Sequence, residues 1–401
     1  MDRLQLSKIK LNALLDITLS INANAPVEEL LAKYDRVLRY YLDIGKMLIF
    51  KRSNVWECIL NDGFSKDMEA IDVESELQNI TEITFDSTKI GIEGVDIIIP
   101  VFNNGLPIAY VFLGDFDEDR KGMSPVLKHL NYIQTISNII IVAIENIRLF
   151  KESLRQESLK KELELAARVQ KMLIPANYQM PKNPKLIVTG FYYPHYEVGG
   201  DCYDCVKLSE TQTGFCIADV SGKGISAAIL MSNFQASLRA LFTCEIKLET
   251  LIEKLNSIVN ANVAGENFIT FFVARYNHVT GTLEYINAAH NPPVLYNTVT
   301  GNILYLHSNC VGIGMLDEIP IINKLELKIS ANTKIVCYTD GLSELKGNDG
   351  NDIGTTAIIK HISNTEPVEN NIKEMIKELG LPDNNPNTFD DISIIAVDII
   401  I

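Results

Sequence analysis

The chain has 401 residues, 47% of them hydrophobic, and a formal net charge of −15. This length suggests two or three domains, and the acidic charge argues against a nucleic-acid or anionic-lipid surface, since both need basic patches. No charge-free apolar run reaches transmembrane length, and the start Met1-Asp2-Arg3-Leu4 lacks the apolar core of a signal peptide. The seven scattered cysteines suit a reducing compartment. We therefore expect a cytoplasmic protein without a membrane partner.

Residues 1–135 predict two amphipathic helices followed by strand pairs. Pro26 suits the first position of the second helix, where its missing N–H costs nothing. Asn103-Asn104-Gly105 between two apolar runs is a strong hairpin signal. The expected helices are 4–21 and 26–41, and the expected strands are 47–51, 56–60, 96–101 and 108–113.

This order of elements, followed by a helix that ends in the run 143–149, resembles the GAF sensory domains. The resemblance implies a domain that senses a small molecule or a protein signal. A structural dimerisation domain without a ligand fits the same residues. No metal-ligand or chromophore-cysteine pattern in residues 1–135 separates the two interpretations.

Residues 136–175 predict a linker helix, within a continuous helix from 127 to 173 that no proline interrupts. Apolar residues form a heptad-like seam that changes phase between Leu154 and Leu159. This pattern predicts a short parallel coiled coil with a stutter, and hence a homodimer. A single helix packed on its own domains is the alternative. The seam residues are Ile140, Ile144, Ile147 and Leu154, then Leu159, Leu163, Ala166, Gln170 and Leu173.

Residues 176–401 alternate strand-like runs with helical stretches. Many of the runs carry the β-branched and aromatic residues that favour strands. Hairpins mixed with paired helices favour a layered α+β fold. The expected strands are 186–193, 214–220, 268–276, 282–287, 304–306, 334–338 and 392–398, and the expected helices are 224–242, 248–260, 356–363 and 368–379.

Four acidic clusters stand in this third segment, and each acid follows a strand-like run or sits beside glycine or another acid. One acid beside a glycine is usually a turn residue. Several carboxylates brought together would repel one another and need cations. Mg²⁺ and Mn²⁺ prefer carboxylate and carbonyl oxygens, so the set could hold two such ions. The clusters are 198–201, 218–224, 338–341 and 389–393.

The order and surroundings of these clusters resemble the metal-dependent (PPM-type) serine/threonine phosphatases, most closely their bacterial SpoIIE-type branch. The resemblance covers residues 165–401 and implies two antiparallel sheets packed face to face with helices outside. The motifs that carry it, besides the acids, are Phe191-Tyr192-Tyr193-Pro194, the small-residue helix 225–241, Phe268–Phe272, Asn287–Pro293 and the helix tail Leu165–Pro175.

The resemblance also implies roles for individual residues around two Mn²⁺ or Mg²⁺ ions. Asp219 would bridge both ions, and the carbonyl of Val220 would coordinate as well. Asp340 and Asp390 would complete the catalytic ligands, and Asp201 would lie near the first ion. Asp391 ranks second to its neighbour as a ligand.

The implied reaction is hydrolysis of a phosphate monoester by a water that the two ions activate. No cysteine nucleophile is needed, and the sequence contains neither the C-x5-R motif of cysteine phosphatases nor a Walker loop. Lys223 fits either a phosphate-binding cation or a solvated loop residue. For His290 a structural role is favoured over that of a general acid.

Four positions depart from the pattern of the family without removing a ligand. Ala289 replaces a glycine before His290, and Ser393 stands where threonine is usual. Cys202 and Cys205 replace aromatic residues. They form a C-x-x-C, but no second pair completes a zinc site, so we expect buried thiols.

The sequence thus favours a serine/threonine protein phosphatase controlled by an N-terminal sensor through the linker helix. By resemblance, its substrate is a phosphorylated STAS-type anti-sigma-factor antagonist or a similar regulator. A catalytically silent scaffold of the same fold and a phosphatase for a small metabolite are the alternatives.

Overall fold

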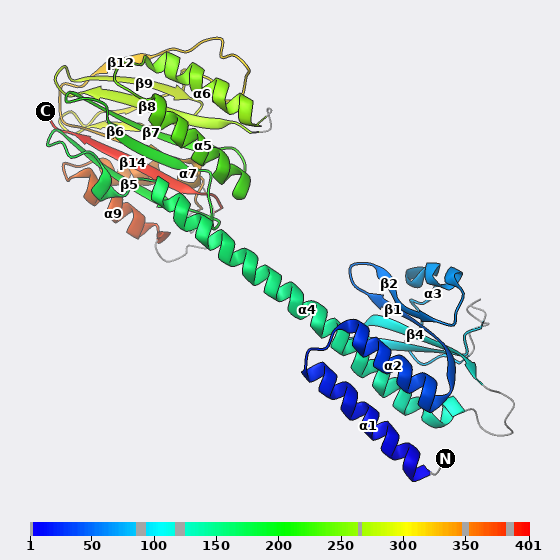
Figure 1. Ribbon diagram of the computed structural model, residues 1–401. Helices are drawn as coiled ribbons and strands as arrows, with labels where there is room; N and C mark the ends of the chain where they lie inside the picture. Colours follow the sequence, from blue (N-terminus) through cyan, green and yellow to red (C-terminus); the bar gives the residue numbers. More distant parts are fainter. Residues whose placement is uncertain (1–2, 86–93, 117–124, 264–266, 347–352, 382–388) are drawn as a thin grey trace. The chain divides into compact units, whose positions relative to one another are not determined.

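The computed structural model describes residues 3–85, 94–116, 125–263, 267–346, 353–381 and 389–401 (Figure 1). The chain divides into two compact units, Met1–Ser158 and Leu159–Ile401. Each unit has hydrophobic cores of its own.

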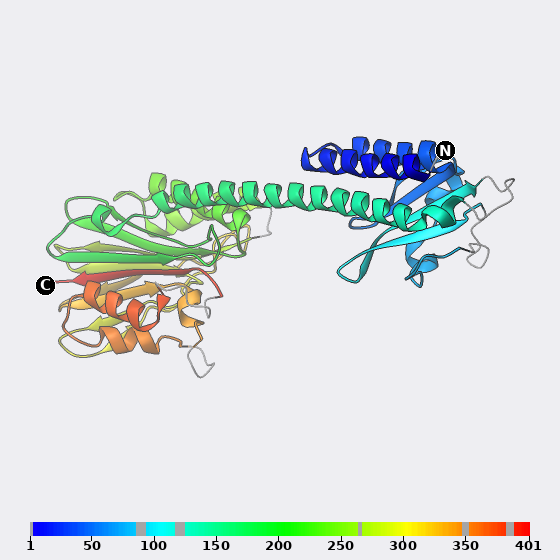
Figure 2. The same ribbon diagram turned by 90° about the horizontal axis from the view of Figure 1, so that it is seen from below.

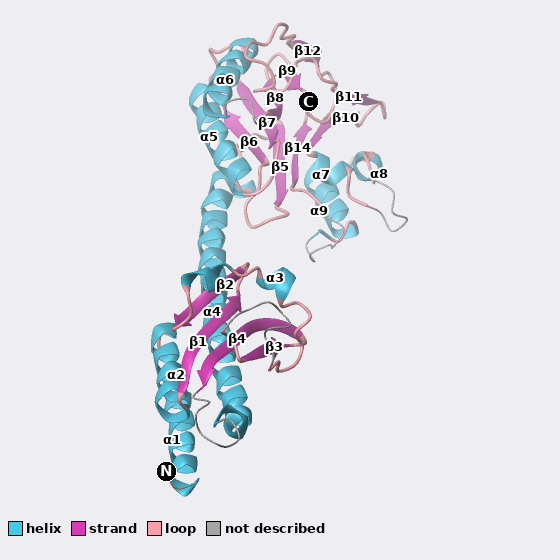
Figure 3. Ribbon diagram, turned by 90° about the vertical axis from the view of Figure 1, so that its right-hand side faces the viewer, coloured by secondary structure: helices cyan, strands magenta, loops and turns pink. Residues whose placement is uncertain are grey.

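The N-terminal unit is built on a four-stranded antiparallel sheet with the strand order β2-β1-β4-β3. Alternate residues of β1 serve two cores: Met47 and Ile49 pack in the core that contains the long helices, whereas Leu48 and Phe50 pack with Val73 of α3. Figure 3 shows the long helices and α3 beside this sheet. The elements are α1 Arg3–Asn22, α2 Val27–Leu42, β1 Ile44–Arg52, β2 Trp56–Asp62, η1 Lys66–Ala70, α3 Val73–Glu76, β3 Ile97–Asn103 and β4 Leu106–Phe116.

Every element expected for residues 1–135 is present, with ends shifted by a few residues. The short helices η1 and α3 were not predicted, because they are too short to show a helical hydrophobic periodicity. Asp72 caps α3, because its side chain accepts hydrogen bonds from the N–H groups of Glu74 and Ser75. The GAF character of this unit remains a prediction.

A buried ion pair joins β1 to helix α4 (Pro125–Leu173) inside the N-terminal unit. Lys51 is only 3% exposed, and its Nζ donates to Glu145 Oε2 at 2.5 Å. Arg148 donates to Glu145 Oε1 at 2.8 Å. The hydrogen bonds from Arg148 lower the pKa of Glu145, and those from Lys51 act in the same direction against the effect of burial.

Helix α4 is continuous over 49 residues, as the lack of proline predicted. Ile140 and Ile144 of the predicted seam are buried within their own unit, in the core that also contains residues of the sheet. Residues 151–160 are all exposed, including Leu154 and Leu159 at 50% and 54%. The first part of the seam therefore serves the packing of the unit itself, while the coiled coil remains a prediction for the exposed part.

A helical span, His129–Gln179, is long and apolar enough by length and composition to cross a membrane. Of its most apolar window, 44% is buried inside the structure. Length and composition do not distinguish a membrane span from a core helix.

The C-terminal unit is a sandwich of two five-stranded antiparallel sheets, with the orders β11-β10-β13-β14-β5 and β12-β9-β8-β7-β6. One core lies between the sheets, and helices cover both outer faces (Figure 2). The strands are β5 Leu186–Tyr193, β6 Cys202–Lys207, β7 Gln212–Val220, β8 Ile269–Asn277, β9 Thr282–Ala288, β10 Val294–Asn297, β11 Ile303–Tyr305, β12 Leu325–Lys328, β13 Thr333–Tyr338 and β14 Ile392–Ile399.

Two groups of helices form the outer layers of this sandwich. The pair α5 and α6 packs on the sheet that contains β7, and the group α7, α8 and α9 packs on the sheet that contains β14. The predicted architecture of two face-to-face sheets with helices outside is confirmed. The helices are η3 Asn177–Gln179, α5 Ile225–Leu241, α6 Leu248–Val263, α7 Asp340–Ser343, α8 Thr356–Ile362 and α9 Val368–Glu378.

The C-x-x-C residues lie on β6, which the sequence did not predict because its polar residues break the strand signal. Cys202 and Cys205 are both buried and unbridged, as expected. Burial raises the pKa of both thiols, so they stay protonated at neutral pH.

Candidate metal centre

Asp219 stands near the end of β7, where the backbone turns toward α5. It pairs across the sheet with Thr270 on β8. Gly222 and Gly224 follow with φ of 94° and 75°, in the left-handed region that favours glycine. These two glycines let the chain leave the strand sharply, so that Asp219 stays at the rim of the sandwich.

Asp201 enters the site from the loop before β6 and is only 2% exposed. Its Oδ2 is buried and has no hydrogen-bond partner among the described residues. Burial raises the pKa of Asp201 well above its ordinary value, and the charges of Asp219 and Asp391 add to the effect, while hydrogen bonding with Thr339 and Ser393 acts against it. A buried carboxylate in this state is normally satisfied by a donor or a cation.

Asp340 and the pair Asp390-Asp391 come from the ends of two adjacent strands, β13 and β14. Asp391 is buried, and its Oδ1 and Oδ2 accept the N–H groups of His195 at 2.8 Å and Gly200 at 2.7 Å. The side chain of Asp390 is 35% exposed and lies 2.7 Å from Lys223 Nζ. Asp391 thus holds a loop in place, while Asp390 faces outward.

The carboxylates act on one another electrostatically. Burial, together with the charges of Asp340 and Asp390, raises the pKa of Asp219 to about 7. The pKa of Asp340 is raised by burial and by the charge of Asp390. The structure therefore brings all five predicted acids, which lie far apart in the sequence, into one electrostatic cluster: Asp201, Asp219, Asp340, Asp390 and Asp391.

Within the part of the chain that the structure describes, no three His, Cys, Asp or Glu side chains form a ready metal site. The donor set nevertheless fits hard divalent cations, since it consists of carboxylates that disfavour each other's charge and includes the unpartnered Oδ2 of Asp201. The carbonyl of Val220 lies beside the loop that contains Gly200 and Asp201. A Cβ built on Gly200 would lie 3.0 Å from this carbonyl oxygen. These residues are the ones that would hold the ions.

His290 is buried and makes hydrogen bonds with Asn287 and Thr270. Its N–H donates to Asn287 Oδ1 at 2.8 Å, and its Nδ1 lies 2.8 Å from Thr270 Oγ1. Burial lowers the pKa of His290 to about 3, so the ring is neutral. Ala289 before it has φ of 56°, which explains why glycine suits this position. These contacts favour the structural role for His290.

Two ion pairs near the acids were not predicted from the sequence. Arg239 on α5 donates through Nε to the buried Asp204 on β6 at 2.5 Å. Lys223 also donates to the carbonyl of Phe389 at 2.7 Å, besides its contact with Asp390. Both pairs join residues that are distant in the sequence, so no local pattern could indicate them.

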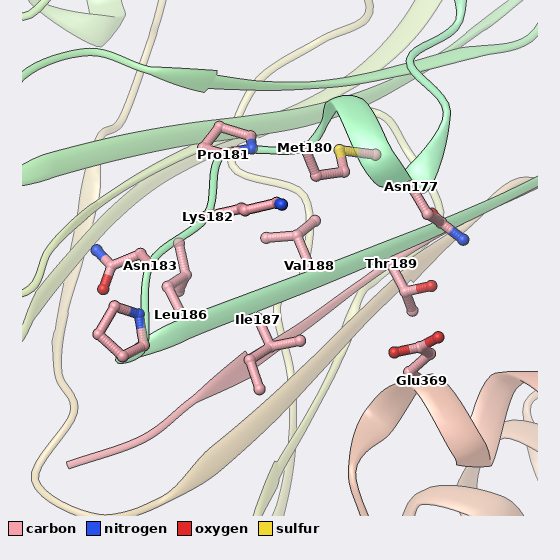
Figure 4. Close-up of a pocket in the computed structure, with 11 residues that line it drawn as sticks. Asn177, Met180, Pro181, Lys182, Asn183, Leu186, Ile187, Val188, Thr189 and Glu369 are labelled. Atoms are coloured by element: carbon pink, nitrogen blue, oxygen red, sulfur yellow. The ribbon is translucent and has the colours of Figure 1, made fainter.

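A cavity of about 590 Å³ lies away from the acids, along the start of β5 (Figure 4). Met180, Lys182 and Val188 line it, together with Glu369 on α9. None of the predicted site residues contributes to its walls. The cavity therefore does not coincide with the acids. The partial exposure of Asp390 shows that the acidic cluster reaches the surface.

The comparison with protein families matches residues 209–400 to SpoIIE, described as stage II sporulation protein E. These residues form a SpoIIE-family domain. Phosphoserine phosphatase RsbU of Bacillus subtilis (strain 168) is 29% identical over 195 residues, which are 49% of this chain and 57% of RsbU. Phosphoserine phosphatase RsbP of the same strain is 26% identical over 193 residues, 46% of each chain. The chain thus spans about half the length of these relatives.

The SiaA-PP2C domain of Pseudomonas aeruginosa has the same fold as the SpoIIE-family domain. The two structures superpose with a TM-score of 0.51 at 16% identity, over 60% of this chain and 97% of that domain. The likeness shows a PP2C-type fold, which agrees with the two stacked sheets described above.

Proposed function

We propose that the C-terminal unit, which contains the SpoIIE-family domain, hydrolyses phosphoserine or phosphothreonine on a protein, with two Mn²⁺ or Mg²⁺ ions as cofactors. The observation that carries the proposal is the arrangement of Asp201, Asp219, Asp340 and Asp390 at neighbouring strand ends, with the buried Oδ2 of Asp201 among them. A structural role alone does not explain a cluster that destabilises the fold when it is charged.

The position of each acid in the fold indicates its role in holding the ions. Asp219, Asp340 and Asp390 come from three different strand ends and would hold the ions, with Asp201 and the carbonyl of Val220 on the inner side. When bound, the ions supply an activated water and neutralise charge on the phosphoryl group. Lys223, whose side chain is 45% exposed, offers an ammonium at the rim beside Asp390.

The surface position of the site supports a protein substrate over a small metabolite. Asp390 is 35% exposed, and the cavity near β5 lies elsewhere. RsbU and RsbP are named phosphoserine phosphatases. By this resemblance we propose a phosphorylated STAS-type regulator as the substrate, in the cytoplasm.

The N-terminal unit is proposed to be a GAF-like sensor that controls the phosphatase through α4. Residues 151–160 of α4 are exposed, and Leu154 and Leu159 would be covered by the same helix of a second copy. The phase change of the seam between them gives the helix pair two packings of similar energy.

The test is hydrolysis of a phosphoserine peptide by the full chain, with Mn²⁺ and with EDTA. We expect turnover with Mn²⁺, its loss in EDTA, and its loss in Asp219→Asn. Turnover that persists in EDTA would contradict the two-ion proposal. Absence of turnover on every phosphopeptide and on p-nitrophenyl phosphate would favour the silent scaffold.

A further inference from the structure

Gln170 is a buried polar residue in a largely exposed stretch of α4. It is 6% exposed, whereas Val169 and Met172 beside it are 61% and 76% exposed. Glutamine is seldom buried unless its amide is fully bonded. Its burial therefore calls for a specific partner.

That partner is the backbone of Gly199. Nε2 of Gln170 donates to the carbonyl of Gly199 at 2.6 Å, and the N–H of Gly199 donates to Gln170 Oε1 at 3.1 Å. One side-chain amide thus holds both polar groups of a single residue. A pair of bonds fixes orientation as well as position.

Gly199 lies directly against the predicted metal ligands. A Cβ at Gly199 would collide with the carboxylate of Asp391 and would come within 2.5 Å of the Tyr192 hydroxyl. The next residue, Gly200, donates its N–H to Asp391 Oδ2 at 2.7 Å, and Asp201 follows. Gln170 therefore holds a loop in which neighbouring residues provide one acid and orient another.

We propose that Gln170 is a positioning residue for the metal centre, which through Gly199 sets Asp201 for cation binding and keeps Asp391 in place behind the loop. The proposal rests on the proposed function, because it assumes that Asp201 binds a cation.

The simpler explanation is that Gln170 only fastens the end of α4 to the domain. Gln235 on α5 provides a matched control for that explanation. It is 2% exposed, and its Nε2 donates to the carbonyl of Leu173 at 2.6 Å. Gln235 thus fastens the same end of the same helix without a described contact to the loop 199–201.

The test compares Gln170→Met with Gln235→Met in the full chain. Mn²⁺ binding is measured by calorimetry, and urea unfolding shows that each variant is folded. Both changes should lower stability. Gln170→Met should weaken Mn²⁺ binding about 10–100-fold, the range for partners that orient metal ligands, while Gln235→Met should keep the affinity of the native chain. Gln170→Asn, too short to reach Gly199, gives a second folded variant with the same expected loss.

Three results would overturn the proposal, and they are distinguishable. Equal Mn²⁺ affinity in Gln170→Met, Gln170→Asn and the native chain would leave the proposed function intact and remove the positioning role. Equal weakening in Gln170→Met and Gln235→Met would assign the effect to helix attachment. Absence of Mn²⁺ binding by the native chain would overturn the proposed function, and the positioning role with it.

Discussion

In the N-terminal unit the buried carboxylate of Glu145 accepts hydrogen bonds from Lys51 and Arg148, which lower its pKa. In the C-terminal unit the carboxylate of Asp201 has a buried Oδ2 without a described partner, and burial, together with the charges of Asp219 and Asp391, raises its pKa. Both groups cost desolvation energy when they are charged. Among the described residues, Lys51 and Arg148 pair with Glu145, whereas no cation pairs with Asp201.

The presence or absence of paired cations distinguishes a buried carboxylate that stabilises the fold from one that is available to bind metal ions. Glu145 is matched by cations and gives the N-terminal unit a fixed contact between β1 and α4. Among the described residues, the ion-pair partner of the acids around Asp219 is Lys223, which pairs with Asp390. Removing a carboxylate should therefore have opposite effects on stability in the two units.

The largest expected effect is that of Asp219→Asn. Mn²⁺-dependent hydrolysis should fall at least about 100-fold, beyond the usual effect of residues that only support ligands. In the metal-free chain the same change should raise the thermal midpoint, because it removes one of several repelling charges. Calorimetric scanning in EDTA measures this rise. A lower midpoint would mean that the carboxylate of Asp219 stabilises the fold without cations.

The other acids should rank by how directly they face the ions. Asp340→Asn and Asp390→Asn should be nearly as damaging to turnover as Asp219→Asn, and Asp391→Asn should be milder. Steady-state kinetics with Mn²⁺ gives the order. If Asp391 proves essential while Asp390 tolerates asparagine, the assignment within this pair is reversed.

Glu145→Gln should have the opposite effect on stability, in the N-terminal unit. Loss of one partner from a buried pair costs about 3 kcal/mol, because Lys51 remains buried with an unmatched charge. Urea unfolding measures the loss, with Glu152→Gln on the exposed part of α4 as the control. An unchanged midpoint would show that Lys51 finds other acceptors.

The same pair gives a dependence on pH. The pKa of folded Glu145 lies below its ordinary value of 4.5. Its stabilisation is therefore complete above pH 4.5 and is lost as the pH falls through the lowered pKa. The difference in unfolding free energy between the native chain and Glu145→Gln should shrink on acidification below about pH 4.5. A constant difference down to pH 2 would contradict this account.

Changes of register in α4 should have a smaller, graded effect. Insertion or deletion of residues between Arg155 and Ser158 alters the phase of the exposed seam, and turnover should change several-fold with register if the helix transmits a signal. Light scattering on the same variants tests for the dimer. Identical turnover in every register would make α4 a tether.

The smallest effect concerns Ala289, which has a left-handed backbone conformation. Ala289→Gly should raise the stability of the C-terminal unit by about 1 kcal/mol, because glycine adopts this conformation without steric cost. Chemical unfolding measures the gain, and Ala288→Gly, on a strand, should instead be destabilising.

The sequence predicted most of this architecture, because long periodic segments such as α4 and apolar strands such as β14 carry strong local signals. It missed β6, whose polar residues Asp204 and Lys207 weaken the strand pattern, and the short strands β10 and β12. The acids of the site were found through their glycines and strand ends. The contacts that hold these acids could not be predicted. Gln170 meets Gly199 beside Asp391, and Lys223 meets Asp390, only in the folded chain.

The most direct test of the central claim is the number of Mn²⁺ ions that the full chain binds, measured by the loss of the electron paramagnetic resonance signal of free Mn²⁺. The carboxylate cluster predicts two ions per chain, and Asp219→Asn should bind markedly fewer. A native, folded chain that leaves all added Mn²⁺ free at millimolar concentration would contradict the account.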